Sequence, residues 1–557
     1  MKRILLPIAA TLALAVLPGC QKELDKIVPS GSVMSPEQVQ KGATISPERA
    51  GASVAGLFSM YNEYDFLGAG RQSDFGYPSL SQYLEEAGDN VVSTTHGYNW
   101  FVGGLTHTGF QTKNAQPTVY AWNAFYKNIK LANDIIASMK AGEGDELIDP
   151  VLGQAYSMRA WDYFHLIRLF AKTYKGNESA LGVPIITDET DPAIIANNPR
   201  ATVQEVYDLI LADIDKAVSL LNPDGKPYDP GVKNQISGAV AYGIRARINL
   251  TMHRFAEAAA DAQKAIDNFA GAPFSLKEVS IPNFDDVATG ANSMWGIIIT
   301  NDDDVTTTGI ANWTSMFTSL CFGYGGYTTM VGTYKMLNSR VWKQIPETDI
   351  RREWWVYPHA DGSMGSELLT NAYGEDAQFF LYDIADAWGF APLGAYPYVG
   401  VKFAPNQKDI MSEVNAVDFQ LMRVEEMYYI LAEAQAKAGN LSAGVATLTN
   451  FVKKYRDPGF NKSFSSADAL ADEIYFQKRI EFWGEGVVWY DMLRLHKGIN
   501  RVDPAKKDNG GYPATTRYNI PDGDPMFTWQ IPEAEEQANA GIGTNNNPAA
   551  VPPKDIM

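Results

Sequence analysis

The sequence has few of the residues from which metal sites and disulfides are built. It contains two cysteines, at positions 20 and 321, and six histidines, none of which stands four residues from another. A zinc site made of cysteine thiolates needs more cysteines than this, so that class of site is excluded. Acidic residues outnumber basic ones and give a net charge of −19. This charge argues against nucleic-acid binding, which needs clustered lysine and arginine, and against electrostatic adhesion to anionic lipid.

Motifs of the common enzyme classes are missing as well. The sequence has no G-x-x-x-x-G-K-[ST] phosphate loop, no H-E-x-x-H zinc motif and no G-x-S-x-G nucleophile motif. After the first twenty residues no segment reaches 18 uninterrupted apolar residues, so we expect the rest of the chain to be soluble. With 557 residues, 45% of them hydrophobic and 20% charged, the composition is that of a folded protein with a sizeable core.

The N-terminus differs in kind from the rest of the chain. Lys2 and Arg3 precede the apolar run ILLPIAATLALAV, which is short and broken by proline, as in a signal peptide. The run ends in Leu17-Pro18-Gly19-Cys20, which resembles a bacterial lipobox, the motif whose cysteine is acylated. We therefore predict a lipoprotein signal peptide over 1–19 and lipidation at Cys20; a plain cleaved signal peptide is the alternative.

The residues after the lipobox fit a tether. The acids in QKELD, directly after Cys20, resemble the surface-export signal of Bacteroidetes lipoproteins. Gly, Pro and Ser between Pro29 and Pro47 indicate a flexible connection. We predict a lipid-anchored tether over 20–47 and a single body over 48–557. Lipidation leaves Cys321 as the remaining thiol, so no disulfide forms within the chain.

Helical hydrophobic spacing recurs in pairs of segments. Ala258, Ala262, Ala265 and Phe269 follow one another at spacings of four, three and four, which is helical. Small alanines on one face let two helices approach closely, as in tetratricopeptide repeats. We predict a mainly α scaffold of such pairs over about 120–270 and 419–497. The predicted helical segments are 120–140, 151–171, 202–222, 234–251, 254–269, 429–455 (divided at Gly439-Asn440), 467–483 and 487–497.

Residues 271–418 have a different character. Gly, Pro, Asn, Asp and aromatic residues are dense there, and only short strand-like runs occur, such as WGIIIT at 295–300. A similar irregular stretch lies at 65–118. Long irregular segments on a helical scaffold are where function is expected.

Five stretches spread over nearly the whole chain together match a known family. They are the lipobox and residues 159–187, 422–439, 478–495 and 529–548. In this order and separation they resemble the SusD/RagB family, surface lipoproteins that work with TonB-dependent transporters in Bacteroidetes. The chain departs from the family pattern at Gln477-Lys478, Val488 and Gln530-Ile531-Pro532, and these departures bear on the ligand more than on the fold.

The resemblance implies a fold, a location and partners. The fold is mainly α, with four tetratricopeptide-like helix pairs and long irregular, aromatic-rich loops, and it has no catalytic activity and no cofactor. The protein is expected on the outer membrane, facing the cell exterior. There it would cap a SusC-like TonB-dependent transporter and capture a glycan for import, or a peptide, as in some members.

One acidic stretch, at 477–495, raises the possibility of catalysis. Glu481 and Glu485 are four residues apart, so a continuous helix would bring their carboxylates within about 5–6 Å, near the spacing of retaining glycosidases. Glycines flank Glu485, however, and Arg479 and Arg494 are close in sequence. We predict that these acids, with Asp491, are ion-paired ties at a helix joint, and we keep a glycoside hydrolase as the alternative.

A second group of acids is a weak metal candidate. Asp302-Asp303-Asp304, with Asp285-Asp286 nearby, offers the oxygen ligands that calcium takes. The run lacks the Gly and the distal Glu of an EF-hand loop. A solvated turn is the preferred interpretation, and bound calcium is left open.

Aromatic side chains in the irregular regions are the candidate ligand contacts, because sugar rings stack on aromatic faces and their hydroxyls need polar partners. Tryptophans 122, 161, 483 and 489 fall on predicted helices and are expected in the core; the other eight lie in or beside irregular regions. In the family, two loops form the ligand platform, here 96–101 and 312–327. The resemblance thus implies ligand contacts from Tyr98, Asn99, Trp100, Asn312, Trp313 and Tyr324.

Three classes of function are open on sequence alone. The first is a lipoprotein that binds glycan for a transporter, with peptide as the alternative ligand. The second is a glycoside hydrolase. The third is a pure tetratricopeptide scaffold for protein assembly, which gives no reason for the aromatic-rich insertion.

Overall fold

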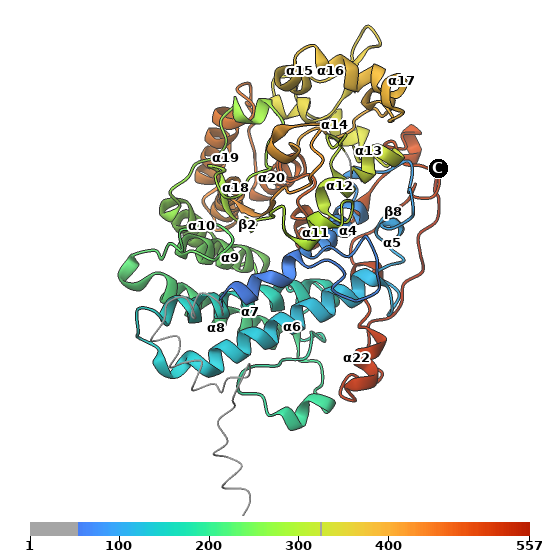
Figure 1. Ribbon diagram of the computed structural model, residues 1–557. Coiled ribbons are helices and arrows are strands. Elements are labelled where there is room, and N and C mark those ends of the chain that lie inside the picture. The colour runs from blue at the N-terminus through green and yellow to red at the C-terminus, as the bar shows by residue number, and fades with distance from the viewer. Residues whose placement is uncertain (1–53, 324–325) are drawn as a thin grey trace, which may run out of the picture.

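The computed structural model describes residues 54–323 and 326–557 (Figure 1). The predicted signal peptide, the lipidated Cys20 and the tether lie outside these residues, and so does Tyr324.

The helical repeats form an arc along the bottom and one side of the molecule (Figure 1). Each helix packs on the next along the chain, and α10 packs on α18 across the intervening insertion. The predicted helices are confirmed to within a few residues, because their apolar positions recur at the helical period. The helices are α6 (Gln116–Met139), α7 (Asp149–Phe170), α8 (Val203–Leu221), α9 (Gly238–Thr251), α10 (Phe255–Asn268), α18 (Val424–Lys437), α19 (Leu441–Tyr455), α20 (Ala467–Glu481) and α21 (Val488–Arg494).

Small residues and caps explain the close packing of these helices. Ala258, Ala262 and Ala265 of α10 are fully buried, as their spacing predicts. The N-terminus of α8 has a capping box, in which the Thr202 side chain accepts from the backbone N–H of Glu205 and the Glu205 carboxylate accepts from that of Thr202. Such a cap satisfies backbone donors that the first helical turn leaves unpaired.

One strand pair joins the insertion to the repeats. Strand β2 (Ser293–Ile297) pairs antiparallel with β6 (Phe419–Arg423), which leads directly into α18. The strand predicted at WGIIIT is therefore confirmed, and its partner comes from the far end of the insertion. Short antiparallel pairs occur elsewhere: β1 (Val91–Val92) with β3 (Met336–Leu337), β4 (Tyr357–Pro358) with β5 (Met364–Gly365), and β7 (Ile499–Asn500) with β8 (Asn519–Ile520).

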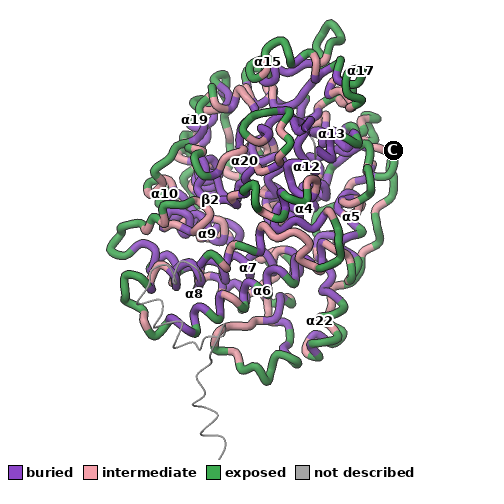
Figure 2. Tube along the Cα trace, viewed as in Figure 1, coloured by how far each residue is buried: buried purple, intermediate pink, exposed green. Residues whose placement is uncertain are grey.

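The insertion forms the upper half of the molecule and is built of short helices (Figure 1). Helix α4 (Tyr77–Ala87) lies between this half and the repeats, and all of its residues are buried. Figure 2 shows the buried residues continuing through the centre of the molecule around α4 and α12. The remaining helices are α5 (Val102–Leu105), α11 (Asp304–Thr307), α12 (Trp313–Phe317), α13 (Tyr327–Val331), α14 (Ser339–Trp342), α15 (Glu367–Tyr373), α16 (Asp376–Gln378), α17 (Ile384–Trp388) and α22 (Glu533–Ala538).

Candidate functional site

The acidic stretch at 477–495 is a buried ion-pair network. Glu481 at the end of α20 is fully buried, and its carboxylate accepts from Arg456 Nε at 2.7 Å, Arg423 at 3.0 Å and Arg351 at 3.1 Å. Burial raises the pKa of this carboxyl, but the guanidiniums of Arg456, Arg423 and Arg351 outweigh burial and hold that pKa well below its usual range. A carboxylate held charged among three arginines does not donate a proton as a glycosidase acid must.

The other two acids are paired in the same way. Glu485 contacts Lys402 at 2.6 Å and Arg423 at 2.8 Å, and Asp491 contacts Lys478 and Arg494. The predicted helix joint with ion-paired acids is confirmed. One partner is corrected: Arg479 pairs with Asp89, at 2.9 Å, rather than with Glu481.

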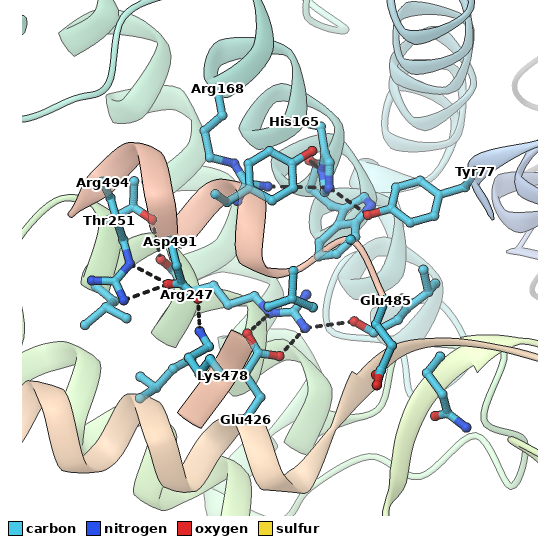
Figure 3. Close-up of a pocket in the computed structure, with 18 residues that line it drawn as sticks. Tyr77, His165, Arg168, Arg247, Thr251, Glu426, Lys478, Glu485, Asp491 and Arg494 are labelled. Atoms are coloured by element: carbon cyan, nitrogen blue, oxygen red, sulfur yellow. Dashed lines mark hydrogen bonds and ion pairs between the residues drawn. The ribbon is translucent and has the colours of Figure 1, made fainter. Parts of the chain in front are cut away.

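A small polar cavity lies beside this joint (Figure 3). Its volume is about 40 Å³, and side chains from α7, α9, α18 and α21 line it. Among the described residues, the polar atoms of the Gln420 amide and the Tyr490 hydroxyl have no hydrogen-bond partner, so the cavity suits a few bound waters.

Most of the charged and polar side chains that line this cavity have hydrogen-bond or ion-pair partners within the protein. In Figure 3, His165 lies between Tyr77 and Arg168, and its Nε2 is 3.1 Å from the Tyr77 hydroxyl. The other ring nitrogen donates to the Trp161 carbonyl at 2.8 Å. Burial and Arg168 lower the pKa of His165 well below its usual value, so the ring is neutral and structural.

Three aromatic rings form a surface group that we name the aromatic platform: Tyr98, Trp100 and Tyr327. The Trp100 and Tyr327 rings stack with centroids 4.7 Å apart and planes 29° apart. Tyr98 lies over both, 5.6 Å from Trp100 and 6.0 Å from Tyr327, and is 68% exposed. The two segments that supply these rings are far apart in sequence. Tyr98 is exposed and Trp100 is partly exposed, whereas Tyr327 is buried and supports the two of them.

Backbone geometry fixes the platform. The backbone N–H of Tyr98 donates to the Tyr327 hydroxyl at 2.6 Å, and the Tyr83 hydroxyl donates to the Trp100 carbonyl at 2.7 Å. Gly97 has a φ of 47°, and a Cβ there would lie 1.9 Å from the Tyr327 hydroxyl. Only glycine allows this approach. Asn99 also has a positive φ, 66°, and its side chain is exposed beside the rings.

A buried ion pair lies beneath the platform. Trp100 and Tyr327 line a cavity of about 20 Å³ together with Glu86, His96 and Lys335. The Lys335 ammonium is 2.9 Å from the Glu86 carboxylate, and their side chains are 6% and 0% exposed. Burial and the Lys335 charge lower the pKa of His96, which keeps this ring neutral at pH 7.

Two predicted contacts are corrected because they are buried. Asn312 is 1% exposed, and its side chain caps α12 by accepting from the Ser315 backbone at 2.8 Å. Trp313 is 4% exposed, and its ring packs on Phe403 at 4.7 Å and Phe419 at 5.4 Å. Both side chains are occupied within the core and do not reach the surface.

The structure brings the remaining predicted residues together and adds one that the sequence prediction missed. Tyr98, Asn99 and Trp100 lie in one loop, and the added residue is Tyr327, whose ring packs against Tyr98 and Trp100. The predicted Tyr324 lies outside the described residues. The signal was present in the same stretch, where the run Gly-Tyr-Gly-Gly-Tyr ends at Tyr327. Gly326 directly precedes α13, and the first residue of that helix, Tyr327, stacks on Trp100 of the other loop.

Most loop tryptophans turn out to be core residues. Of the eight in or beside irregular regions, six are buried, at positions 295, 313, 342, 354, 355 and 529. Those predicted for the core, at 122, 161, 483 and 489, are buried as expected.

Two acids of the run at 302–304 accept hydrogen bonds from backbone N–H groups. The Asp303 carboxylate accepts from the Thr300 backbone at 2.6 Å and the Asp304 carboxylate from the Tyr64 backbone at 3.0 Å. Within residues 54–323 and 326–557, no group of three His, Cys, Asp or Glu side chains is arranged to hold a metal ion. Over the same residues, no helix combines the length and the apolar character that crossing a membrane requires.

A helical-repeat scaffold with a long, aromatic-rich insertion defines the class of protein, and comparison with known proteins gives the family. A family model described as "SusD family" matches residues 302–548, and one described as "Starch-binding associating with outer membrane" matches residues 76–250. The chain belongs to the SusD/RagB family.

Individual relatives are distant in sequence but cover most of the chain. SusD-like protein P2 of Formosa agariphila is 25% identical over 458 residues, which are 76% of this chain and 79% of the relative. A SusD-like carbohydrate binding protein from Bacteroides vulgatus has 20% identity and a TM-score of 0.70, covering 90% of this chain and 98% of its own. Surface glycan-binding protein A from Bacteroides uniformis has 15% identity and a TM-score of 0.59, covering 91% and 100%. These structures share the fold.

Proposed function

We propose that this protein is a non-enzymatic lipoprotein of the outer membrane that binds a glycan and delivers it to a SusC-like TonB-dependent transporter. Residues 1–19 are the signal peptide, Cys20 carries the lipid, residues 20–47 are the tether and residues 48–557 are the body, which faces the cell exterior. The ligand contacts are the aromatic platform and Asn99.

The observation that carries this proposal is the exposed platform on a rigid support. The exposed Tyr98 ring and the partly exposed Trp100 ring, supported by the buried Tyr327, suit the flat C–H faces of sugar residues. Asn99 beside them supplies an amide for sugar hydroxyls. The backbone bonds to Tyr327 and Trp100 hold the rings in place before ligand arrives, which reduces the entropy lost on binding. Relatives described as carbohydrate-binding and glycan-binding support the same ligand class.

Peptide is the second candidate ligand. The net charge of −19 suits basic peptides, and exposed tyrosine and tryptophan rings also anchor peptides. The platform residues themselves carry no charge, however, which favours a neutral sugar surface over a charged peptide.

Affinity electrophoresis tests the proposal. The protein is run through native gels that contain starch, laminarin, xylan, mannan or pectin, and casein peptides are titrated calorimetrically alongside. We expect one or more polysaccharides to retard the protein, and the Tyr98→Ala/Trp100→Ala double variant to migrate as it does in a gel without polysaccharide. Retardation of the double variant equal to that of the unchanged protein contradicts the site, and binding of casein peptides alone contradicts the ligand.

Two controls sharpen this result. Ile194 is 49% exposed and lies away from the platform residues in sequence and contacts, so Ile194→Ala controls for the loss of an exposed apolar side chain. Reducing-sugar release from the retarding polysaccharide is measured in the same samples. Release above background by the unchanged protein would favour the glycoside hydrolase instead.

A further inference from the structure

Exposure of tryptophan is exceptional in this protein. In the part of the chain that the structure describes, ten of the twelve tryptophans are buried, and the two that are not are Trp100 and Trp388. Trp100 belongs to the aromatic platform. Trp388, at the end of α17, is 49% exposed and has no part in the site described above. Single exposed apolar side chains are common on protein surfaces, whereas a group of them marks a contact surface, so the neighbours of Trp388 decide what it indicates.

The Trp388 ring packs against the ring of Phe379. Its centroid is 4.8 Å from that of Phe379, with the planes 76° apart, in an edge-to-face contact. The chain leaves α17 through Gly389, which has a φ of 74° and caps the helix in the left-handed conformation. The ring therefore has a defined position, and the residue remains half exposed.

The segment after Trp388 lies against α13, the helix that begins with Tyr327 of the platform. The Ala391 carbonyl accepts from the Tyr334 hydroxyl at 2.8 Å. A Cβ added at Gly332, which directly follows α13, would be 3.6 Å from the Ala391 Cβ. The Thr95 hydroxyl, in the loop that carries Tyr98, donates to the Gly332 carbonyl at 2.7 Å. Gly332 thus touches both the platform loop and the Trp388 segment.

Helix α13, which begins with Tyr327, also carries exposed apolar side chains. Met330 and Val331 of α13 are 52% and 38% exposed. Figure 1 shows α13 between α5, which follows the platform loop, and α17. We name the exposed and partly exposed apolar residues of these three segments the aromatic ridge; they are Tyr98, Trp100, Met330, Val331 and Trp388.

We propose that Trp388 is a second contact point for an extended polysaccharide chain, so that the protein selects glycans long enough to reach from the platform to Trp388. This inference rests on the proposed glycan-binding function. The exposed Asp383 and Asp386 lie within five residues of Trp388 in the sequence. They accept hydrogen bonds from sugar hydroxyls, whereas an acidic rim does not favour the burial of Trp388 against an anionic partner surface.

Chain-length dependence of binding tests the proposal. The probes are the polysaccharide that retards the unchanged protein most strongly in the gel panel and oligosaccharides obtained from it by partial hydrolysis and size fractionation. In the Trp388→Ala variant we expect affinity for the polysaccharide to fall about tenfold, the effect of one aromatic stacking contact. Affinity for the shortest oligosaccharides that bind should stay within about twofold, because they contact the platform only.

Matched variants separate this effect from a general one. Trp388→Phe keeps a ring and should retain part of the long-chain affinity. Tyr98→Ala/Trp100→Ala should weaken short and long ligands alike. The half-exposed Trp388 ring contributes little to the core, so the thermal midpoint of Trp388→Ala should match that of the unchanged protein and show that the fold is intact.

The outcomes are distinguishable. The second contact point is overturned if Trp388→Ala has unchanged affinity for the polysaccharide, or if it loses affinity equally for short and long chains. The exposed Trp388 ring would then be assigned to a contact with another protein. Failure of the unchanged protein to bind any polysaccharide of the panel refutes the proposed function itself, and the inference with it. Loss confined to long chains supports both.

Discussion

Lys335 and Glu86 form a buried ion pair, 2.9 Å apart, directly beneath the stacked rings of Trp100 and Tyr327. Removing one member of a buried pair leaves an uncompensated charge, which typically costs about 3–5 kcal/mol. We therefore expect Lys335→Met to lower the free energy of unfolding by about that amount, as measured by urea denaturation, and to weaken polysaccharide retardation. The Glu86→Gln/Lys335→Met double variant should recover most of the stability, because neither charge is then left alone. A double variant as unstable as the single one would show that the pair acts through packing.

Trp313 and Trp100 should respond in opposite ways to removal of the ring. Trp313 is 4% exposed and packs on Phe403 and Phe419, so Trp313→Ala should cost about 3–5 kcal/mol of stability through the cavity that it leaves. Trp100 is partly exposed, and Trp100→Ala should cost about 1 kcal/mol or less while it reduces glycan affinity about tenfold. Denaturation and affinity electrophoresis on both variants check this. A stable Trp313→Ala variant with lost binding would restore the original assignment of Trp313 to the site.

The contrast between these tryptophans shows what local sequence can and cannot reveal. The helices were predictable because apolar positions repeat within each segment, and the lone strand run at 295–300 was visible in the same way. Burial of Trp313 depends on Phe403 and Phe419, which lie about a hundred residues further along the chain. No local pattern carries that contact.

The ion-pair partners of Glu481 also lie too far along the chain to be predicted from local sequence. The sequence predicted ion-paired acids at a helix joint and named the two arginines close in sequence, Arg479 and Arg494, of which Arg494 does pair with Asp491. The arginines that bind Glu481 instead come from positions 351, 423 and 456. The first lies in the short 3-10 helix Ile350–Trp354, the second in β6 and the third at the end of α19. The sequence was enough to predict that Glu481 is ion-paired, whereas the identity of the paired arginines depends on the tertiary fold.

Glu85 should make stability depend on pH. Burial raises the pKa of its carboxyl from 4.5 to about 7, although the Gly486 backbone donates to it at 2.8 Å. The folded state therefore holds a proton that the unfolded chain has lost, so this group's stabilising contribution is complete below pH 4.5 and is lost as the pH rises to about 7. Relative to Glu85→Gln, the unchanged protein should lose about 2–3 kcal/mol of stability over this interval. Urea denaturation of both proteins between pH 4.5 and 8 measures the difference, and parallel pH curves would contradict it.

Gly97 should control binding without contacting the ligand. Its φ of 47° and the distance of 1.9 Å between an added Cβ and the Tyr327 hydroxyl leave no room for a side chain. Gly97→Ala should therefore push the 96–100 loop away from α13, break the bond from the Tyr98 backbone to Tyr327 and separate the stacked rings. We expect at least a tenfold loss of glycan affinity, together with a loss of about 1–2 kcal/mol of stability from the left-handed backbone.

Gly68→Ala is the matched control for Gly97→Ala. Gly68 has a φ of 65°, and nothing lies within 4 Å of an added Cβ, so it carries the same backbone cost with no effect on the platform. If both variants lose similar stability and only Gly97→Ala loses affinity, the stacking of Trp100 on Tyr327 is needed for binding. Equal affinity in the two variants would mean that the loop accommodates the methyl group and that the ligand does not depend on the stacked arrangement of these rings.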